Sequence, residues 1–239
     1  MGLEIAVGML ARTAQEDPEE LDFMRKSFDA LNAVLVAAGA EPHNEPLDLA
    51  EDAMFEAQMW GYSGLHRVRR LAAYQALKGT LPSPELRSEG PSGDPVLKQL
   101  YALHGAHFGK LPKPGFLAAL FGSRPKKPRY QHLIWHSDCE GFYLPRDFDE
   151  VILDRATSPG HGAMVGSSVR LLADCRELAH LIGLPEGVHP EDDPAWEPDQ
   201  TPPPDAPLWR SYDIEALCLA NLIQGCEASI RSNAALQFI

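Results

Sequence analysis

Residues 131–153, QHLIWHSDCEGFYLPRDFDEVIL, decide the fold predicted from this sequence. Residues 132–136 have the aromatic and branched side chains typical of a strand, and residues 142–144 read as a second strand. Between them, residues 137–141 offer small polar side chains and a glycine that can adopt a positive φ. Pro145 then ends the second strand or places it at a sheet edge. The stretch therefore predicts a strand, a five-residue turn and a returning strand, which together form a central hairpin.

The predicted turn gathers groups that carry chemistry. His132 and His136 share one face of the expected strand, and Asp138, Cys139 and Glu140 follow directly. One interpretation is structural, with the polar side chains bonded to backbone amides and Cys139 packed as a small apolar group. A second is an exposed acidic tip that binds a partner. A third is a hydrolase or transferase in which His136 or His132 activates Cys139, and a fourth is a metal site of His132, His136 and Asp138.

The chain is acidic, with 21 Lys and Arg against 34 Asp and Glu and a net charge of −13. This balance argues against binding to nucleic acid, because phosphates are neutralised by a basic surface. It suits a basic protein partner. The four cysteines form no C-x-x-C pair, so we expect free thiols and neither a metal nor another cofactor. No apolar run reaches the length of a membrane span, and the sequence predicts a cytoplasmic protein.

Apolar spacing predicts several helices around this hairpin. The pattern favours helices over 17–39, 65–77, 96–104, 169–182 and 209–231, with a loose helix over 48–59. The helix over 65–77 is expected to expose a basic cluster of His66, Arg67, Arg69 and Arg70. Such a cluster could bind an anion, but we expect it to form a solvated face paired with nearby acids.

The predicted architecture is α+β. A small, mainly antiparallel sheet combines the N-terminal strand, the central hairpin and the C-terminal strand, and four or five helices cover it. Both ends of the chain enter this sheet, so residues 1–239 are expected to form a single domain. Two proline-rich excursions interrupt the domain at about residues 80–93 and 186–207. The second, named here the acidic arm, is too polar to fold alone.

One resemblance adds to this interpretation. HSDCEGFYLPRDF, at residues 136–148, resembles a segment of bacterial cytoplasmic proteins, some of which are similar to immunity proteins of polymorphic toxin systems. The starting MGLEI and residues 171–185, LLADCRELAHLIGLP, contribute to the likeness. The resemblance implies a non-catalytic protein that neutralises a basic toxin. It carries over no catalytic residues.

The residues expected to contact a basic partner lie in two segments. They are Asp138, Glu140 and Tyr143 at the hairpin, and Glu191, Asp192, Asp193 and Trp196 on the acidic arm. Negative side chains would accelerate association with such a partner, and an aromatic residue inside a charged rim is typical of an energetic hot spot.

Overall fold

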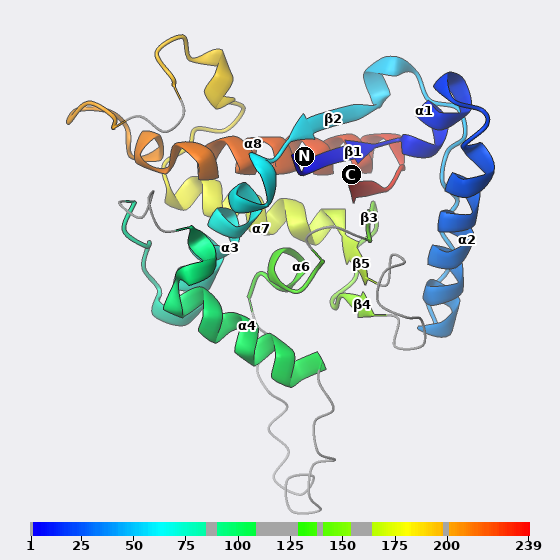
Figure 1. The fold of residues 1–239 in the computed structure, drawn as a ribbon, viewed down its shortest axis with the longest axis horizontal. Helices are drawn as coiled ribbons and strands as arrows, with labels where there is room; N and C mark the ends of the chain where they lie inside the picture. The colour runs from blue at the N-terminus through cyan, green and yellow to red at the C-terminus, as the bar shows by residue number, and fades with distance from the viewer. Residues whose placement is uncertain (1, 85–89, 109–128, 138–140, 154–163, 198–200) are drawn as a thin grey trace, which may run out of the picture.

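The computed structural model describes residues 2–84, 90–108, 129–137, 141–153, 164–197 and 201–239. Within these ranges the fold is α+β, with one six-stranded sheet of order β2-β1-β6-β3-β5-β4 (Figure 1). The strands are β1 (Glu4–Val7), β2 (Phe55–Gln58), β3 (Phe142–Leu144), β4 (Ile152–Leu153), β5 (Met164–Ser167) and β6 (Leu236–Phe238). Strands β3 and β5 are parallel and the other neighbours are antiparallel, so the sheet is mixed.

The described part of the chain contains seven α-helices and four short 3-10 helices. The α-helices are α1 (Met9–Glu16), α2 (Leu21–Ala37), α3 (Gly61–Lys78), α4 (Pro95–Phe108), α6 (Gln131–Ile134), α7 (Ser168–Leu181) and α8 (Asp213–Ser232). The 3-10 helices are η1 (Glu51–Ala53), η2 (Pro91–Gly93), η3 (Pro190–Asp192) and η4 (Leu208–Tyr212).

The sheet lies between two apolar layers. Phe142 and Leu144 pack with Phe28 and Leu31 of α2 on one face, whereas Tyr143 joins the larger core formed with α3, α7 and α8 on the other. This alternation is the two-residue period of a strand that is buried on both faces. Figure 1 shows α1 and α2 together at one end of the molecule, and α7 and α8 side by side.

The first and last strands belong to one sheet, as the sequence predicted, and the structure pairs them directly. The amide of Glu4 donates to the carbonyl of Ile239 at 3.1 Å, and the amide of Ile239 donates to the carbonyl of Glu4 at 2.9 Å. Helices α2, α3, α7 and α8 also follow the predicted spacing, and the Ser167 hydroxyl caps α7 by accepting from the amide of Arg170 at 3.1 Å.

The predicted central hairpin is wrong, because its first half is helical. Residues 131–134 form α6, and β3 pairs with β5 and β6. The buried guanidinium of Arg69 donates to the carbonyls of Leu133 at 2.9 Å and His136 at 2.7 Å. The carbonyl groups at the C-terminal end of a helix have no donor within the helix, and here they are buried. The bonds from Arg69 satisfy them. A short apolar run cannot distinguish a buried helix from a strand.

The sheet is larger than predicted, because three of its strands were not expected. Residues 48–59 were predicted as a loose helix, but they contain η1 and then β2. Strands β4 and β5 extend the other side of the sheet. Each of these strands has only two to four residues, too few to display a clear two-residue pattern.

Candidate functional site

A groove of about 460 Å³ runs beside β2, the outermost strand of the sheet. The groove is lined by all four residues of β2, by Trp60, by two residues of η3 and the histidine before it, and by residues of α8. The lining residues are Phe55, Glu56, Ala57, Gln58, Trp60, His189, Glu191, Asp192, Leu217, Asn221 and Gln224. The groove therefore has an open strand edge as one wall and part of the acidic arm as another.

A strained turn after β2 places Trp60 at one end of this groove. Trp60 has φ 53° and is followed by Gly61 at φ 64°, so two consecutive residues are left-handed. Gly64 allows α3 to begin so close to the strand, because a Cβ there would lie 1.9 Å from the carbonyl oxygen of Met59. A bulky residue in the left-handed region is a genuine outlier, and such outliers concentrate at functional sites. The Trp60 side chain is held outward, with 43% of the residue exposed.

A hydrogen-bond chain fixes η3 against β2. The side-chain amide of Asn221 donates to the carbonyl of Gln58 at 2.8 Å, so its Oδ1 is left to accept from His189 Nε2, also at 2.8 Å. His189 Nδ1 is then the unprotonated nitrogen, and it accepts from the amide of Glu191 at 3.4 Å. The position of Glu191 is thereby tied to the strand that forms the opposite wall.

The groove is lined by carboxylates. Glu56, Glu191 and Asp192 are all exposed, and the described lining residues include neither lysine nor arginine. Arg12 approaches from α1 and pairs with Glu56, which is itself 40% exposed in its side chain. Two further carboxylates, Glu51 and Asp52 of η1, are exposed at the start of β2. We name this set the acidic edge: Glu51, Asp52, Glu56, Glu191 and Asp192.

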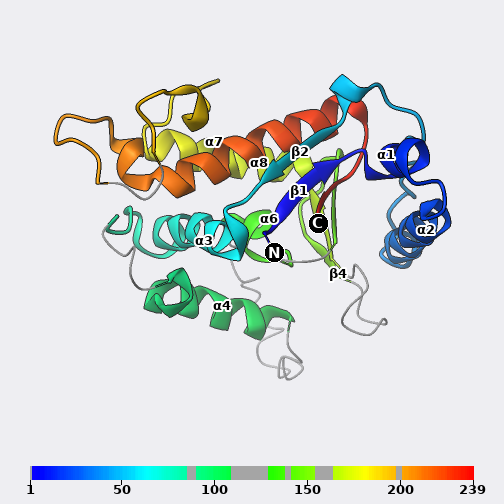
Figure 2. The same ribbon diagram turned by 45° about the horizontal axis from the view of Figure 1, so that its top comes forward.

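The acidic edge joins segments that are distant in the sequence. Figures 1 and 2 both show η1 and the acidic arm on the same edge of the molecule, toward opposite ends of β2. Residues 1–60 contain 13 acidic and 3 basic residues, and residues 186–239 contain 10 acidic and 2 basic residues. The middle of the chain, residues 61–185, is net positive, with 16 basic and 11 acidic residues. The negative charge of the protein therefore resides in its two terminal segments.

The acidic arm contains both free and neutralised predicted contacts. Glu191 and Asp192 line the groove and stay candidate contacts. Asp193 instead pairs with Arg210, and the pKa of its carboxyl is lowered by the backbone amide of Ala195 and then by Arg210. Trp196 is partly buried against the main core. Asp193 and Trp196 therefore attach the acidic arm to the rest of the protein instead of facing a partner.

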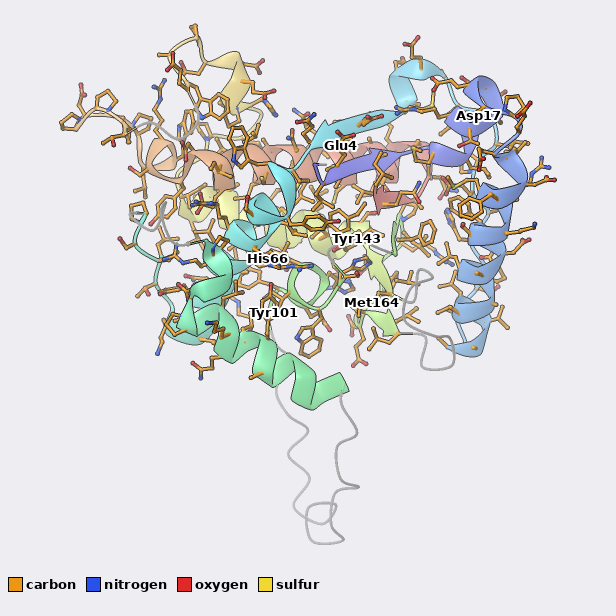
Figure 3. All side chains as sticks on the ribbon, in the orientation of Figure 1. Glu4, Asp17, His66, Tyr101, Tyr143 and Met164 are labelled. Carbon is orange, nitrogen blue, oxygen red and sulfur yellow. The ribbon has the colours of Figure 1, made fainter. Side chains whose placement is uncertain are left out.

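Of the residues predicted as partner contacts at the hairpin, Tyr143 is the one that the structure describes. Asp138, Cys139 and Glu140 lie outside the described residues. Tyr143 is fully buried, and its hydroxyl donates to the carbonyl of His132 at 3.0 Å, so its place among the partner contacts is wrong. Figure 3 shows Tyr143 in the interior of the molecule.

Both histidines proposed as partners of Cys139 belong to the core. His136 stacks on Tyr143 with ring centroids 3.9 Å apart, and His132 Nδ1 accepts from the amide of Ser167 at 3.0 Å. Burial lowers the pKa of each histidine to about 4. Such imidazoles stay neutral near pH 7, but His132 is only 2% exposed and His136 only 4%, so neither is open to solvent. Among the residues that the structure describes, no group of three His, Cys, Asp or Glu side chains is placed to hold a metal.

The basic cluster is also placed differently from the prediction. Arg69 and Arg70 are each only 3% exposed, so they do not form a solvated face. Arg70 Nε donates to Asp94 Oδ2 at 2.7 Å, and Asp94 Oδ1 caps the start of α4 by accepting from the amides of Val96 and Leu97. His66 Nδ1 lies 2.9 Å from the Tyr101 hydroxyl of α4 (Figure 3). The cluster therefore connects α3 to α4 and α6.

Sequence reasoning missed Glu51, Asp52 and Glu56 as site residues. Their segment was predicted as a loose helix, and its acids were not singled out as contacts. The signal that could have found them is the imbalance of charge along the chain, with most of the negative charge in residues 1–60 and 186–239.

Comparison with known proteins corrects the resemblance noted in the sequence. A family model described as "Putative DNA-mimic protein" matches residues 1–238. No curated protein and no solved structure matches the chain. The resemblance to immunity proteins is therefore wrong, and so is the expected toxin partner, because the family description is of a protein that imitates DNA. An acidic protein with a binding role is compatible with the match.

No helix in the described ranges combines the length and the apolar character needed to cross a membrane.

The match to the family model extends over nearly the whole sequence and includes every segment of the acidic edge. The chain belongs to the family described as "Putative DNA-mimic protein".

Proposed function

We propose that this protein binds a DNA-binding protein at the surface that contacts DNA, with the carboxylates of the acidic edge in the place of backbone phosphates. The observation that carries the proposal is the groove beside β2, where Glu191 and Asp192 are exposed and no described lining residue is cationic. Glu56 pairs with Arg12 of α1, but its side chain stays 40% exposed, so a cation of the partner can still reach it. The family match supports the same role, because its description is of a protein that imitates DNA.

Carboxylates reproduce what a DNA-binding surface recognises in a phosphate. Arginine forms paired, charge-assisted hydrogen bonds with either group, and lysine binds either as a point charge. A four-residue strand such as β2 spans about 13 Å, which is the axial length of about four base pairs with roughly eight phosphates. The acidic edge has five carboxylates, which is fewer than these phosphates. It therefore corresponds to the phosphates on the one side of a duplex that a protein contacts.

The strength of such binding should depend on salt. Exposed charges are screened beyond about 10 Å at an ionic strength of 0.1 M, so added salt weakens attraction between the acidic edge and a basic surface. Added salt should slow association by a larger factor than it speeds dissociation, because long-range attraction mainly steers the encounter of the two proteins.

The experiment begins with DNA-binding proteins recovered from a lysate on immobilised duplex DNA and eluted with salt. This fraction is passed over the immobilised protein at low ionic strength, and bound material is challenged with free duplex DNA. We expect a subset of the fraction to be retained and then released by the duplex. Retained proteins that duplex DNA does not displace would contradict the proposal, because they would be held away from their DNA-contacting surface.

Two variants of equal charge locate the binding surface. Glu56→Gln/Glu191→Gln/Asp192→Asn neutralises the groove, and we expect it to lose most of the retention. Asp147→Asn/Asp149→Asn/Glu150→Gln removes the same charge from exposed positions between β3 and β4, and it should retain its partners. Equal loss in both variants would show that only net charge matters and would refute the assignment to the acidic edge.

A further inference from the structure

The pairing of β2 determines which of its backbone groups face the groove. The amide of Met59 donates to the carbonyl of Leu3 at 2.8 Å, and the register pairs Ile5 with Ala57 and Val7 with Phe55. In an antiparallel ladder, hydrogen-bonded and non-bonded pairs alternate. Phe55, Ala57 and Met59 therefore direct their backbone groups toward β1.

Glu56 and Gln58 consequently direct their backbone groups away from the sheet. The same alternation holds on β1, where Glu4 exchanges two hydrogen bonds with Ile239 on the other side. The outward carbonyl of Gln58 accepts from Asn221 at 2.8 Å. Within the described structure, no partner meets the outward amides of Glu56 and Gln58 or the outward carbonyl of Glu56. These groups form the strand wall of the groove.

We propose that an extended segment rich in lysine and arginine, contributed by the DNA-binding partner, lies in this groove and pairs with the outer edge of β2. The inference rests on the proposed function and specifies how the partner is held. An unpaired strand edge is a template for another strand, and main-chain hydrogen bonds then provide affinity whatever the sequence. Glu56, Glu191 and Asp192 around this edge select a basic segment.

Side chains of the added strand would alternate between the two sides of the groove. Cationic side chains would reach Glu191 and Asp192, which η3 holds through His189 and Asn221. Trp60 lies at the end of β2, with its indole exposed, where a guanidinium could stack on it. A second copy of this chain is disfavoured as the occupant, because it would place Glu56 near the same carboxylates of its neighbour.

A short synthetic peptide of alternating arginine and valine tests the pairing directly. Hydrogen exchange of the Glu56 and Gln58 amides should slow at least about tenfold when the peptide is bound, while the Ala57 amide, already bonded to β1, serves as the internal reference. Unchanged exchange at Glu56 and Gln58 with the peptide bound would overturn the proposal, and so would failure of the peptide to bind at low ionic strength.

Backbone methylation provides an independent readout. Two isomers of the peptide, methylated on alternate backbone nitrogens, keep the charge but block opposite sets of amides. We expect one isomer to bind about tenfold more weakly than the parent and the other to bind similarly. In the protein, Gln58→Pro removes an outward amide and should weaken binding of the parent peptide. Parent-like binding by both isomers would refute strand pairing.

The two proposals fail in distinguishable ways. If duplex DNA displaces retained proteins but the Glu56 and Gln58 amides stay unprotected, the acidic edge imitates DNA without pairing a strand. If the peptide pairs with β2 but no DNA-displaceable protein is retained, the groove binds basic segments and the proposed function is wrong.

Discussion

Arg69 provides the sharpest test of how the interior of this protein is built. Its side chain donates to the carbonyls of Leu133 at 2.9 Å, His136 at 2.7 Å and Ser137 at 3.1 Å, and it is 3% exposed. Arg69→Met keeps much of the length and removes every donor. The Ser137 carbonyl is part-buried and also lies 3.2 Å from His136 Nδ1, so the carbonyls of Leu133 and His136 are the two that lose their donor. Each buried carbonyl left unsatisfied costs about 1–3 kcal/mol, and the apolar side chain recovers part of this, so we expect a loss of about 2–5 kcal/mol.

The loss is measured as the free energy of unfolding in urea, followed by circular dichroism. Natural domains have only about 5–15 kcal/mol of stability, so Arg69→Met should be severely destabilised. Arg176→Met is the matched control, because Arg176 meets Glu227 at 2.7 Å with half-exposed side chains and should contribute less than about 1 kcal/mol. If Arg69→Met were as stable as this control, the guanidinium would not be what holds α6.

Three further predictions concern the interior and the turn beside the groove. Because burial lowers the pKa of His132 and His136 to about 4, the unfolded chain gains protons first as the pH falls below about 6.5. Stability should therefore decrease from pH 7 to pH 5 by about 2 kcal/mol per histidine, and an undiminished decrease in His132→Asn would contradict this. Gly64→Ala should cost about 3 kcal/mol or more in a thermal melt, whereas Gly93→Ala, with open space around its Cβ, should cost little. Trp60→Asn, which tolerates the left-handed backbone, should keep the fold and weaken retention of DNA-binding proteins; unchanged retention would remove Trp60 from the site.

Local sequence patterns predicted the long elements of this fold. Helices α2, α7 and α8 bury apolar stripes spaced at three and four residues, and such stripes are visible in the sequence. The region 131–136 was mispredicted because Arg69, more than 60 residues earlier, satisfies the carbonyls that make α6 possible. No local pattern contains that information.

The residues of the proposed acidic edge were only partly visible in the sequence, for a similar reason. Glu191 and Asp192 stood out in a proline-rich acidic segment, whose polarity forces it to the surface. Glu56 did not stand out, because its importance comes from the position of β2 at the sheet edge and from η3 on the opposite side of the groove. Arg69 and Arg70 led to the opposite error, because clustered arginines are usually exposed. Here both are buried: Arg70 pairs with Asp94, and Arg69 donates to backbone carbonyls.

The central claim is that the acidic edge occupies the surface with which its partner binds DNA. It is tested most directly by the fluorescence anisotropy of a labelled duplex bound to a purified protein from the retained fraction, as this protein is added. We predict that anisotropy returns to the value of free duplex with the wild type, and that Glu56→Gln/Glu191→Gln/Asp192→Asn fails to release the DNA. Anisotropy that stays constant or rises, as a ternary complex forms, would contradict the account.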